Sequence, residues 1–266
     1  MTLSEEPVPA TPPAPARREL RAVSLADPFR WLAAGLRDLR AAPVVALFYG
    51  ACFWSMAALL GAVFRHAPEY TMSFVSGCFL VGPFLAMGLY DASRRLERGE
   101  RASLSESLTC WDKRLGSMGL LVLVLLLLEL LWGRASLVVF AVFFDTGMPS
   151  TASVLQAVFN PRNWEFVAVY TVVGGVFAGL VFGTCVVSLP MILDRDTDAI
   201  TAGLSSLQAV TGRPLPLLLW GALIVAVVLG AMALPWAAGL LVAGPWLGHA
   251  SWHAYRGCFR WVEPQA

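Results

Sequence analysis

The segment from Gly116 to Phe144 is an apolar stretch in which Glu129 and Arg134 are the only charged residues. A helix that crosses the roughly 30 Å hydrocarbon core of a bilayer uses about 20 such residues. Over the whole chain of 266 residues, 58% are hydrophobic and 14% are charged, against about 25% charged in a soluble domain. The sequence therefore predicts an all-α membrane protein that crosses the bilayer several times.

Six segments have the length and apolar character of transmembrane helices. Their predicted ranges are Pro43–Phe64, Tyr70–Tyr90, Ser117–Phe144, Trp164–Leu189, Leu215–Leu234 and Ala237–Tyr255. The short Pro235-Trp236 connection predicts a tight hairpin of the last two. We expect residues 27–259 to form a six-span transmembrane domain. Residues 1–26 are expected to be a disordered cytoplasmic tail and residues 260–266 a second, short one. Pro149–Phe159 has the spacing of a short helix on the outer surface.

The Lys and Arg residues are distributed asymmetrically about these spans. Six precede the first span, six lie between the second and third, two lie between the fourth and fifth, and two follow the sixth, so 16 of the 19 fall on one side. Cytoplasmic loops are enriched in these residues. We therefore expect a multi-pass membrane protein with both termini in the cytoplasm. The net charge of +1 gives no indication of a nucleic-acid partner, and the lipid bilayer is the expected environment.

Short related segments precede the first, third and fifth predicted spans. The three segments are Ala34–Leu39, Ser103–Leu108 and Ala202–Leu207. The returning span of each pair contains a proline: Pro83, Pro190 or Pro245. Proline kinks a helix, and neighbouring helices must cover the carbonyl that it frees. The pattern predicts three copies of one unit, an interfacial helix plus a helical hairpin, with the kinked helices facing inward. The alternative is that Gly and Pro are simply common in membrane helices.

Acidic and histidine residues recur at fixed distances after these prolines. The candidates for a shared metal site are Asp91, Asp194, Asp198, His249 and His253. An offset of four keeps two residues on one helical face, and a threefold arrangement of the units would bring all five together. Imidazoles and carboxylates can bind a divalent metal, and a histidine can ligate haem iron. The alternative is that no cofactor is bound, that the histidines make ordinary hydrogen bonds near a helix end, and that the acids cap the helix from Ala199 onward.

Two further patterns lie within the spans. Glu129 is near the middle of the third span, where a charge is costly and usually faces the bundle interior or water. It is either part of a proton or substrate relay or a protonated side chain with one interhelical hydrogen bond. Arg134 lies five positions further on, does not share its face, and can reach the outer surface. Gly175, Gly179 and Gly183 form two GxxxG steps that favour close helix packing, either within the bundle or between copies.

Two stretches carry a resemblance to a known family: Phe79–Gly99, and Val187–Ala199 together with Gly248–Arg256. They resemble an uncharacterised bacterial family of integral membrane proteins with six predicted spans, known as a domain of unknown function. The resemblance extends over about residues 27–259 and implies an inner-membrane location without an established activity. Some relatives carry the label of a cytochrome oxidase subunit, but the three histidines of this chain are too few for a catalytic subunit.

The chain contains no Walker loop, H-E-x-x-H or G-x-S-x-G motif, and we expect a protein that is not an enzyme. Three functions are compatible with these features. The first is a scaffold or accessory subunit of another membrane protein complex, for example a respiratory one. The second is a small transporter or channel for an ion or solute. The third is a metal- or haem-binding protein that uses His249 and His253.

Overall fold

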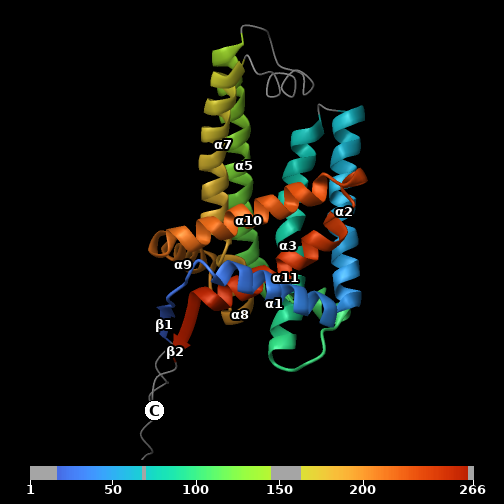
Figure 1. Ribbon diagram of the computed structural model, residues 1–266, viewed down its shortest axis with the longest axis vertical. Helices are drawn as coiled ribbons and strands as arrows, with labels where there is room; N and C mark the ends of the chain where they lie inside the picture. Colours follow the sequence, from blue (N-terminus) through green and yellow to red (C-terminus); the bar gives the residue numbers. More distant parts are fainter. Residues whose placement is uncertain (1–16, 68–69, 145–162, 263–266) are drawn as a thin grey trace, which may run out of the picture.

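The computed structural model describes residues 17–67, 70–144 and 163–262 (Figure 1). The helix predicted at Pro149–Phe159 lies outside the described residues. Among those that are described, five helices are long and apolar enough to cross a membrane. They are Pro43–His66, Ser73–Glu97, Leu115–Phe143, Trp164–Arg195 and Pro214–Met232. The chain is therefore a multi-pass membrane protein, as its composition predicts.

Two upright helix pairs run along the long axis of the molecule (Figure 1). One pair is α2 (Pro43–His66) with α3 (Thr71–Glu97), and the other is α5 (Leu115–Phe143) with α7 (Trp164–Cys185). All four helices expose large apolar side chains, for example Val142 at 74%. Helices that are apolar on every side are typical of a membrane, where lipid takes the place of a protein core.

The third pair consists of α10 (Pro214–Met232) and α11 (Leu240–Cys258), joined by the predicted tight turn at η4 (Pro235–Ala237). This hairpin runs obliquely across the upright pairs (Figure 1). Because α11 is not one of the five sufficiently apolar helices, six apolar spans are not confirmed. The helix α11 can be less apolar than the others because it is surrounded by protein. It buries His249 completely, and a helix in contact with lipid could not carry that side chain without a large cost.

Glycines let α11 approach its neighbours closely. A Cβ atom on Gly50 of α2 would overlap the carbonyl oxygen of Leu241. A Cβ atom on Gly35 of α1 (Asp27–Ala41) would lie 2.6 Å from the backbone nitrogen of Ala250. Small residues at such crossings bring helix backbones into contact where lipid provides no hydrophobic drive. Glycines therefore bring α1 and α2 into close backbone contact with α11, a role that was not predicted for them.

A helical segment precedes each pair, as the predicted repeat requires, but the segments are unequal. The first, α1, has 15 residues, and α9 (Ala199–Gly212) has 14. Between them, α4 (Leu104–Ser107) has only 4. One turn cannot form an amphipathic interfacial helix, so the repeat is not confirmed in its predicted form.

The three prolines are all buried, which agrees with the prediction that they face inward. Pro83 and Pro245 lie inside α3 and α11. At Pro190 the fourth span is interrupted instead of kinked, because α7 ends at Cys185 and α8 (Ser188–Arg195) begins three residues later. Proline is accommodated in the first turn of a helix, where its missing N–H has no intrahelical acceptor.

The two ends of the described chain pair with each other in a two-stranded antiparallel sheet. Strand β1 (Arg17–Leu20) lies beside β2 (Phe259–Val262), with Arg18 opposite Trp261. Residues 1–26 and 260–266 were predicted to be tails. The structure corrects this for residues 17–20 and 260–262, whose hydrogen-bonding partners lie at the other end of the sequence.

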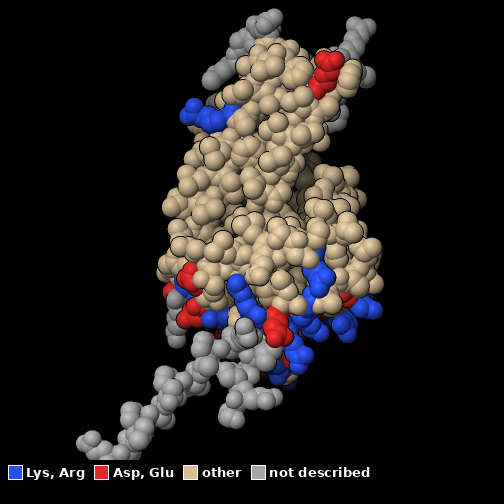
Figure 2. All heavy atoms as spheres, turned by 90° about the vertical axis from the view of Figure 1, so that its left-hand side faces the viewer, with Lys and Arg blue, Asp and Glu red and all other residues tan. Residues whose placement is uncertain are grey.

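Charged side chains gather at one end of the molecule, below a broad surface of uncharged residues (Figure 2). We call this the charged end. It comprises α8, β1, β2 and the connection from α3 to α5 (Figure 1). The polar contacts described next lie mainly here.

Candidate functional site

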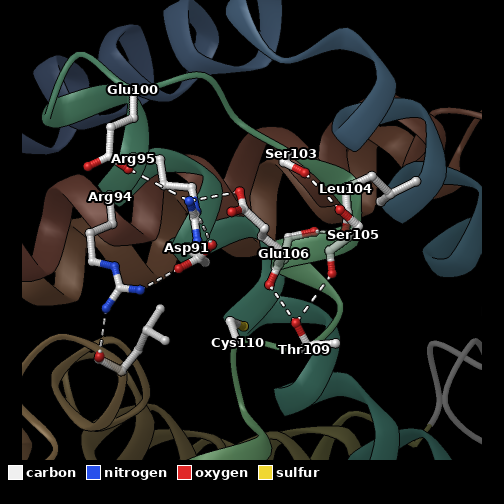
Figure 3. Close-up of polar contacts among 12 residues, drawn as sticks. Asp91, Arg94, Arg95, Glu100, Ser103, Leu104, Ser105, Glu106, Thr109 and Cys110 are labelled. Atoms are coloured by element: carbon white, nitrogen blue, oxygen red, sulfur yellow. Dashed lines mark hydrogen bonds and ion pairs between the residues drawn. The ribbon is translucent and has the colours of Figure 1, made fainter.

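Asp91 of α3 is fully buried and is neutralised by two arginines of its own helix. Arg94 and Arg95 both donate to its carboxylate, with 2.7 Å between Arg95 Nε and Asp91 Oδ2. Arg95 Nη1 also lies 2.8 Å from Oε2 of Glu106 in α4. Figure 3 shows Arg95 between these two acids, linking α3 to the segment that follows it. Both carboxylate oxygens of Asp91 are therefore already engaged.

Two arginines bind the carbonyl groups near the end of α8. Arg94 Nη1 donates to the oxygen of Leu193 over 2.9 Å, and Arg114 Nε donates to the oxygen of Ile192 over 3.0 Å. Carbonyls in the last turn of a helix have no intrahelical partner, and a cation there also favours the helix dipole. These contacts fasten α8 to α3 and to the start of α5.

A second polar network joins α1, α3 and α11. His253 Nε2 donates to Oδ2 of Asp38 over 2.8 Å. Ser93 Oγ lies 2.7 Å from Nδ1 of His249 and also hydrogen-bonds to Asp38. Because the single hydroxyl proton of Ser93 is directed to Asp38, His249 Nδ1–H is the donor to Ser93. Two histidines therefore act on one carboxylate, one directly and the other through a serine.

Asp38 is the anionic centre of this network. Burial raises its pKa, but hydrogen bonds from His253 and Ser93 outweigh that effect, so the pKa lies below its ordinary value. At the other end of the network, Nε2 of His249 is buried without a hydrogen-bond partner among the described residues. An unprotonated nitrogen tolerates this position better than an N–H group would, which agrees with the donor assignment at Nδ1.

The other two acids of the predicted cluster have contacts of their own. Tyr255 donates its hydroxyl to Oδ2 of Asp194 over 2.8 Å. Asp198 accepts a hydrogen bond from the backbone N–H of Thr201 over 2.9 Å, and this bond lowers the pKa of Asp198. Asp198 is thus the N-cap of α9, which confirms the predicted capping of the helix that starts at Ala199.

The five predicted metal ligands are consequently distributed over separate contacts. In the part of the chain that the structure describes, no three His, Cys, Asp or Glu side chains form a group suited to a metal ion. The predicted cluster required three helices related by a threefold axis. Instead, α8 breaks away from α7 and the α10–α11 hairpin runs obliquely, so the selected faces do not converge. His249 contacts Ser93, and His253 contacts Asp38.

Glu129 lies in α5 and is 4% exposed. Ser76 of α3 donates a hydrogen bond to its Oε2 over 2.8 Å, so an interhelical hydrogen bond is present as the second alternative predicted. Oε1 is buried without a hydrogen-bond partner among the described residues. Arg134 is exposed and makes no contact with Glu129, in agreement with the expectation that the two do not share a face.

The glycines of α7 are arranged differently from the prediction of packing within the bundle. Gly175 and Gly179 are exposed, and no heavy atom of the described residues lies within 4 Å of a Cβ added to either. Gly183 does pack internally, with Leu207 of α9 at 3.3 Å from such a Cβ. The central part of the GxxxG face is therefore open.

Sequence reasoning missed several partners. Asp38, Ser93 and Ser76 were not singled out, although each binds a residue that was. Glu97 was also missed, and it accepts hydrogen bonds from Trp252 and Arg256. The i, i+4 spacing of Asp91 and Arg95 was a usable signal for one ion pair. No spacing rule connects the other pairs, because their members are more than 50 positions apart in sequence.

A family model matches part of the chain. Residues 70–194 match a family model described as predicted integral membrane protein (DUF2189). This range runs to α8 and includes Asp91 and Glu129, but it leaves out α1, α10 and α11, so it is narrower than the range of about 27–259 expected from the resemblance. No curated protein and no solved structure matches the chain. Residues 70–194 are therefore similar to the DUF2189 family of predicted integral membrane proteins, whose function is unknown.

Proposed function

We propose that the protein is a non-enzymatic scaffold or accessory subunit that associates with another integral membrane protein of the bacterial inner membrane. The observation that carries this proposal is the open glycine face of α7. Gly175 and Gly179 are exposed there, and Val172 and Val176 flank them with 67% and 58% exposure. Membrane helices that approach closely use small residues at their interface. We infer that a helix of a partner protein packs on this face.

A different face of α7 is occupied by its own bundle. A Cβ atom on Gly174 would lie 3.2 Å from the indole of Trp132 in α5, and Tyr170 packs edge-on against the same indole at 5.2 Å between centroids. This contact anchors α7 to α5. The helix can therefore present its open face to a partner without losing its place in the bundle.

The polar contacts support a structural role. Asp91, Glu97 and Asp38 each receive hydrogen bonds from two residues. Glu97 and Asp38 thereby bind α11, and the two arginines that bind Asp91 also contact α4 and α8. Engaged in this way, the groups stabilise one arrangement of helices. This is the use expected in a scaffold, whose surface must keep its shape for a partner.

We further propose that the charged end faces the cytoplasm and that α11 provides a sixth crossing. The pairing of β1 with β2 supports this topology, because it brings both ends of the described chain to one side. A chain with its ends on one side crosses a bilayer an even number of times, whereas five apolar helices alone would make an odd number. The excess of Lys and Arg in this part of the chain favours the cytoplasmic side. Three hairpins would then follow one another, as the predicted repeat requires.

Site-specific photo-crosslinking tests the docking face. A photoreactive residue at Val176 should give a crosslinked partner in native membranes, whereas one at Val225, which is 57% exposed on α10, should not. Gly179→Leu should abolish the product because the added side chain fills the open face. Gly77→Leu, which also enters open space but on α3, is the matched control and should leave the product unchanged.

Two outcomes would contradict the proposal. Unchanged crosslinking in Gly179→Leu would remove the glycine face from the interaction. A product made only of two copies of this chain would indicate a homo-oligomer instead of an accessory subunit.

The topology is tested by labelling. Impermeant thiol reagents added outside intact cells should fail to label cysteines introduced at Arg21 and Arg260, and labelling of both would mean that the orientation is the reverse of the proposed one.

Transport of an ion or solute is a second candidate, favoured by Glu129. Its carboxyl group is buried within a transmembrane helix and one oxygen lacks a hydrogen-bond partner among the described residues, so that oxygen is available for a proton or a cation. Proteoliposomes should then show a proton or cation flux that Glu129→Gln reduces. Equal flux through both proteins, or none above that of empty vesicles, would remove this candidate.

A further inference from the structure

We propose that an arginine-lined pocket at the charged end binds a phosphate-bearing anion. The pocket has a volume of about 590 Å³ and lies between the two strands and the ends of α8 and α11. Its charged lining residues are Arg21, Arg195, Arg256, Arg260 and Glu19. Four cations therefore face one acid across a single cavity.

The four arginines are not equally engaged. Arg256 Nη2 lies 3.0 Å from Oε1 of Glu97, and Arg195 Nε lies 3.4 Å from Oδ2 of Asp194. Arg21 and Arg260 are exposed, and neither contacts an acidic side chain among the described residues. The pocket thus keeps two guanidinium groups whose hydrogen-bond donors are available to a ligand.

The fold holds these side chains together although they come from distant parts of the sequence. The backbone N–H of Arg21 donates to the carbonyl oxygen of Cys258 over 2.9 Å, which extends the contact between the two ends of the chain and sets Arg21 beside the start of β2. Across the pocket, the guanidinium group of Arg195 lies over the indole of Trp261 at 4.6 Å from its centroid. Like charges brought together in this way repel each other, and a bound anion would relieve the repulsion.

A phosphate group matches this arrangement better than a single carboxylate does. Guanidinium groups bind phosphate oxygens through two parallel N–H donors, and a phosphate offers enough oxygens for more than one arginine. The pocket lies at the charged end, where Figure 1 places β1, β2 and α8. A lipid headgroup and a soluble phosphate compound share the required chemistry.

Binding to the full-length purified protein tests the proposal and separates the two sources. The first probe is inorganic phosphate, compared with chloride at equal ionic strength in a neutral detergent. The second is phosphatidylglycerol, compared with phosphatidylcholine, in vesicles that contain the protein. The readouts are the dissociation constant for phosphate and the thermal unfolding midpoint in each vesicle, because a ligand that binds the folded state raises that midpoint.

Replacing Arg21 and Arg260 together by glutamine should weaken binding about tenfold or more, because charge-assisted hydrogen bonds are lost. Arg98→Gln with Arg101→Gln removes the same charge from two exposed arginines outside the pocket and should change binding by less than about twofold. If the double variant fails to fold, the single variants Arg21→Gln and Arg260→Gln are used instead. Each should show part of the loss of binding affinity.

An arginine-dependent effect of inorganic phosphate alone would assign the site to a soluble phosphate compound. An arginine-dependent effect of phosphatidylglycerol would assign it to a lipid headgroup. The proposal is overturned if the double variant binds both probes as the wild type does, or if the wild type prefers neither probe to its reference. The docking face on α7 is unaffected by either result, because it contains none of these residues.

Discussion

Nε2 of His253 in α11 donates a hydrogen bond to Oδ2 of Asp38 in α1 over 2.8 Å, although the two residues are 215 positions apart in the sequence. The histidine that spacing suggested as a metal ligand therefore links the last helix to the first. Because His249 reaches the same carboxylate through Ser93, the network connects three helices at a single anionic group. The stability of the bundle should depend on the charge of Asp38.

Acidification should therefore destabilise the folded protein. The pKa of Asp38 is lower in the folded state than in the unfolded chain, where it is about 3.9. The stabilisation is fully present above the unfolded value and is lost as pH falls through the folded value, so the thermal midpoint in detergent should drop below about pH 4. Asp38→Asn should lower the free energy of unfolding by about 1–3 kcal/mol at neutral pH. Its thermal midpoint should also depend less on pH below about pH 4.

The matched control is Asp112→Asn, since Asp112 is exposed in the connection before α5 and makes no side-chain contact among the described residues. It should follow the wild type at every pH. If the thermal midpoint of Asp38→Asn falls with decreasing pH as steeply as that of the wild type, other groups cause the acid sensitivity.

The hydrogen bond from Ser76 to Glu129 should couple α3 and α5 within the membrane. We expect Ser76→Ala to destabilise the protein by about 0.5–2 kcal/mol, the range measured for hydrogen bonds between membrane helices. Glu129→Leu with Ser76→Ala should be less destabilising than the sum of the two single changes. Ser73→Ala, at an exposed site of the same helix, is the control. Additive effects in unfolding titrations would mean that the two side chains do not interact.

Close packing at Gly50 should make this site intolerant of any side chain. Even the methyl group of Gly50→Ala would overlap the carbonyl oxygen of Leu241, and overpacking of this kind costs about 1–3 kcal/mol. Gly77→Ala adds the same group where no described atom lies within 4 Å, and it should be neutral or stabilising because alanine favours helix. Equal unfolding free energies for the two variants would contradict the close contact between α2 and α11.

Removal of Asp91 should both destabilise the protein and release the segment after α3. Asp91→Ala leaves Arg94 and Arg95 without their buried carboxylate, a loss of about 3–5 kcal/mol. Arg95 would then no longer be held toward Glu106, so trypsin should cleave faster after Arg98 and Arg101. Asp112→Ala is expected to leave both stability and cleavage unchanged. Wild-type cleavage rates in Asp91→Ala would show that the ion pairs do not order this segment.

Composition and local spacing were sufficient for much of the architecture. Long apolar runs revealed the membrane helices, because lipid requires apolar surface on each of them. The Pro235-Trp236 turn predicted the last hairpin, and Asp198 was identified as a possible helix cap. Each of these features depends on residues that are neighbours along the chain, so a reader of the sequence can recognise them.

The pairing of distant segments could not be recognised in this way. Asp38 with His253, Ser76 with Glu129 and Gly50 with Leu241 join residues whose sequence spacing follows no periodicity. The same holds for β1 with β2, and for α11, whose polar side chains are tolerated because protein surrounds it. These contacts arise from the angle and depth at which whole helices pack. That geometry depends on the summed interactions of many side chains, and a local pattern contains only a few of them.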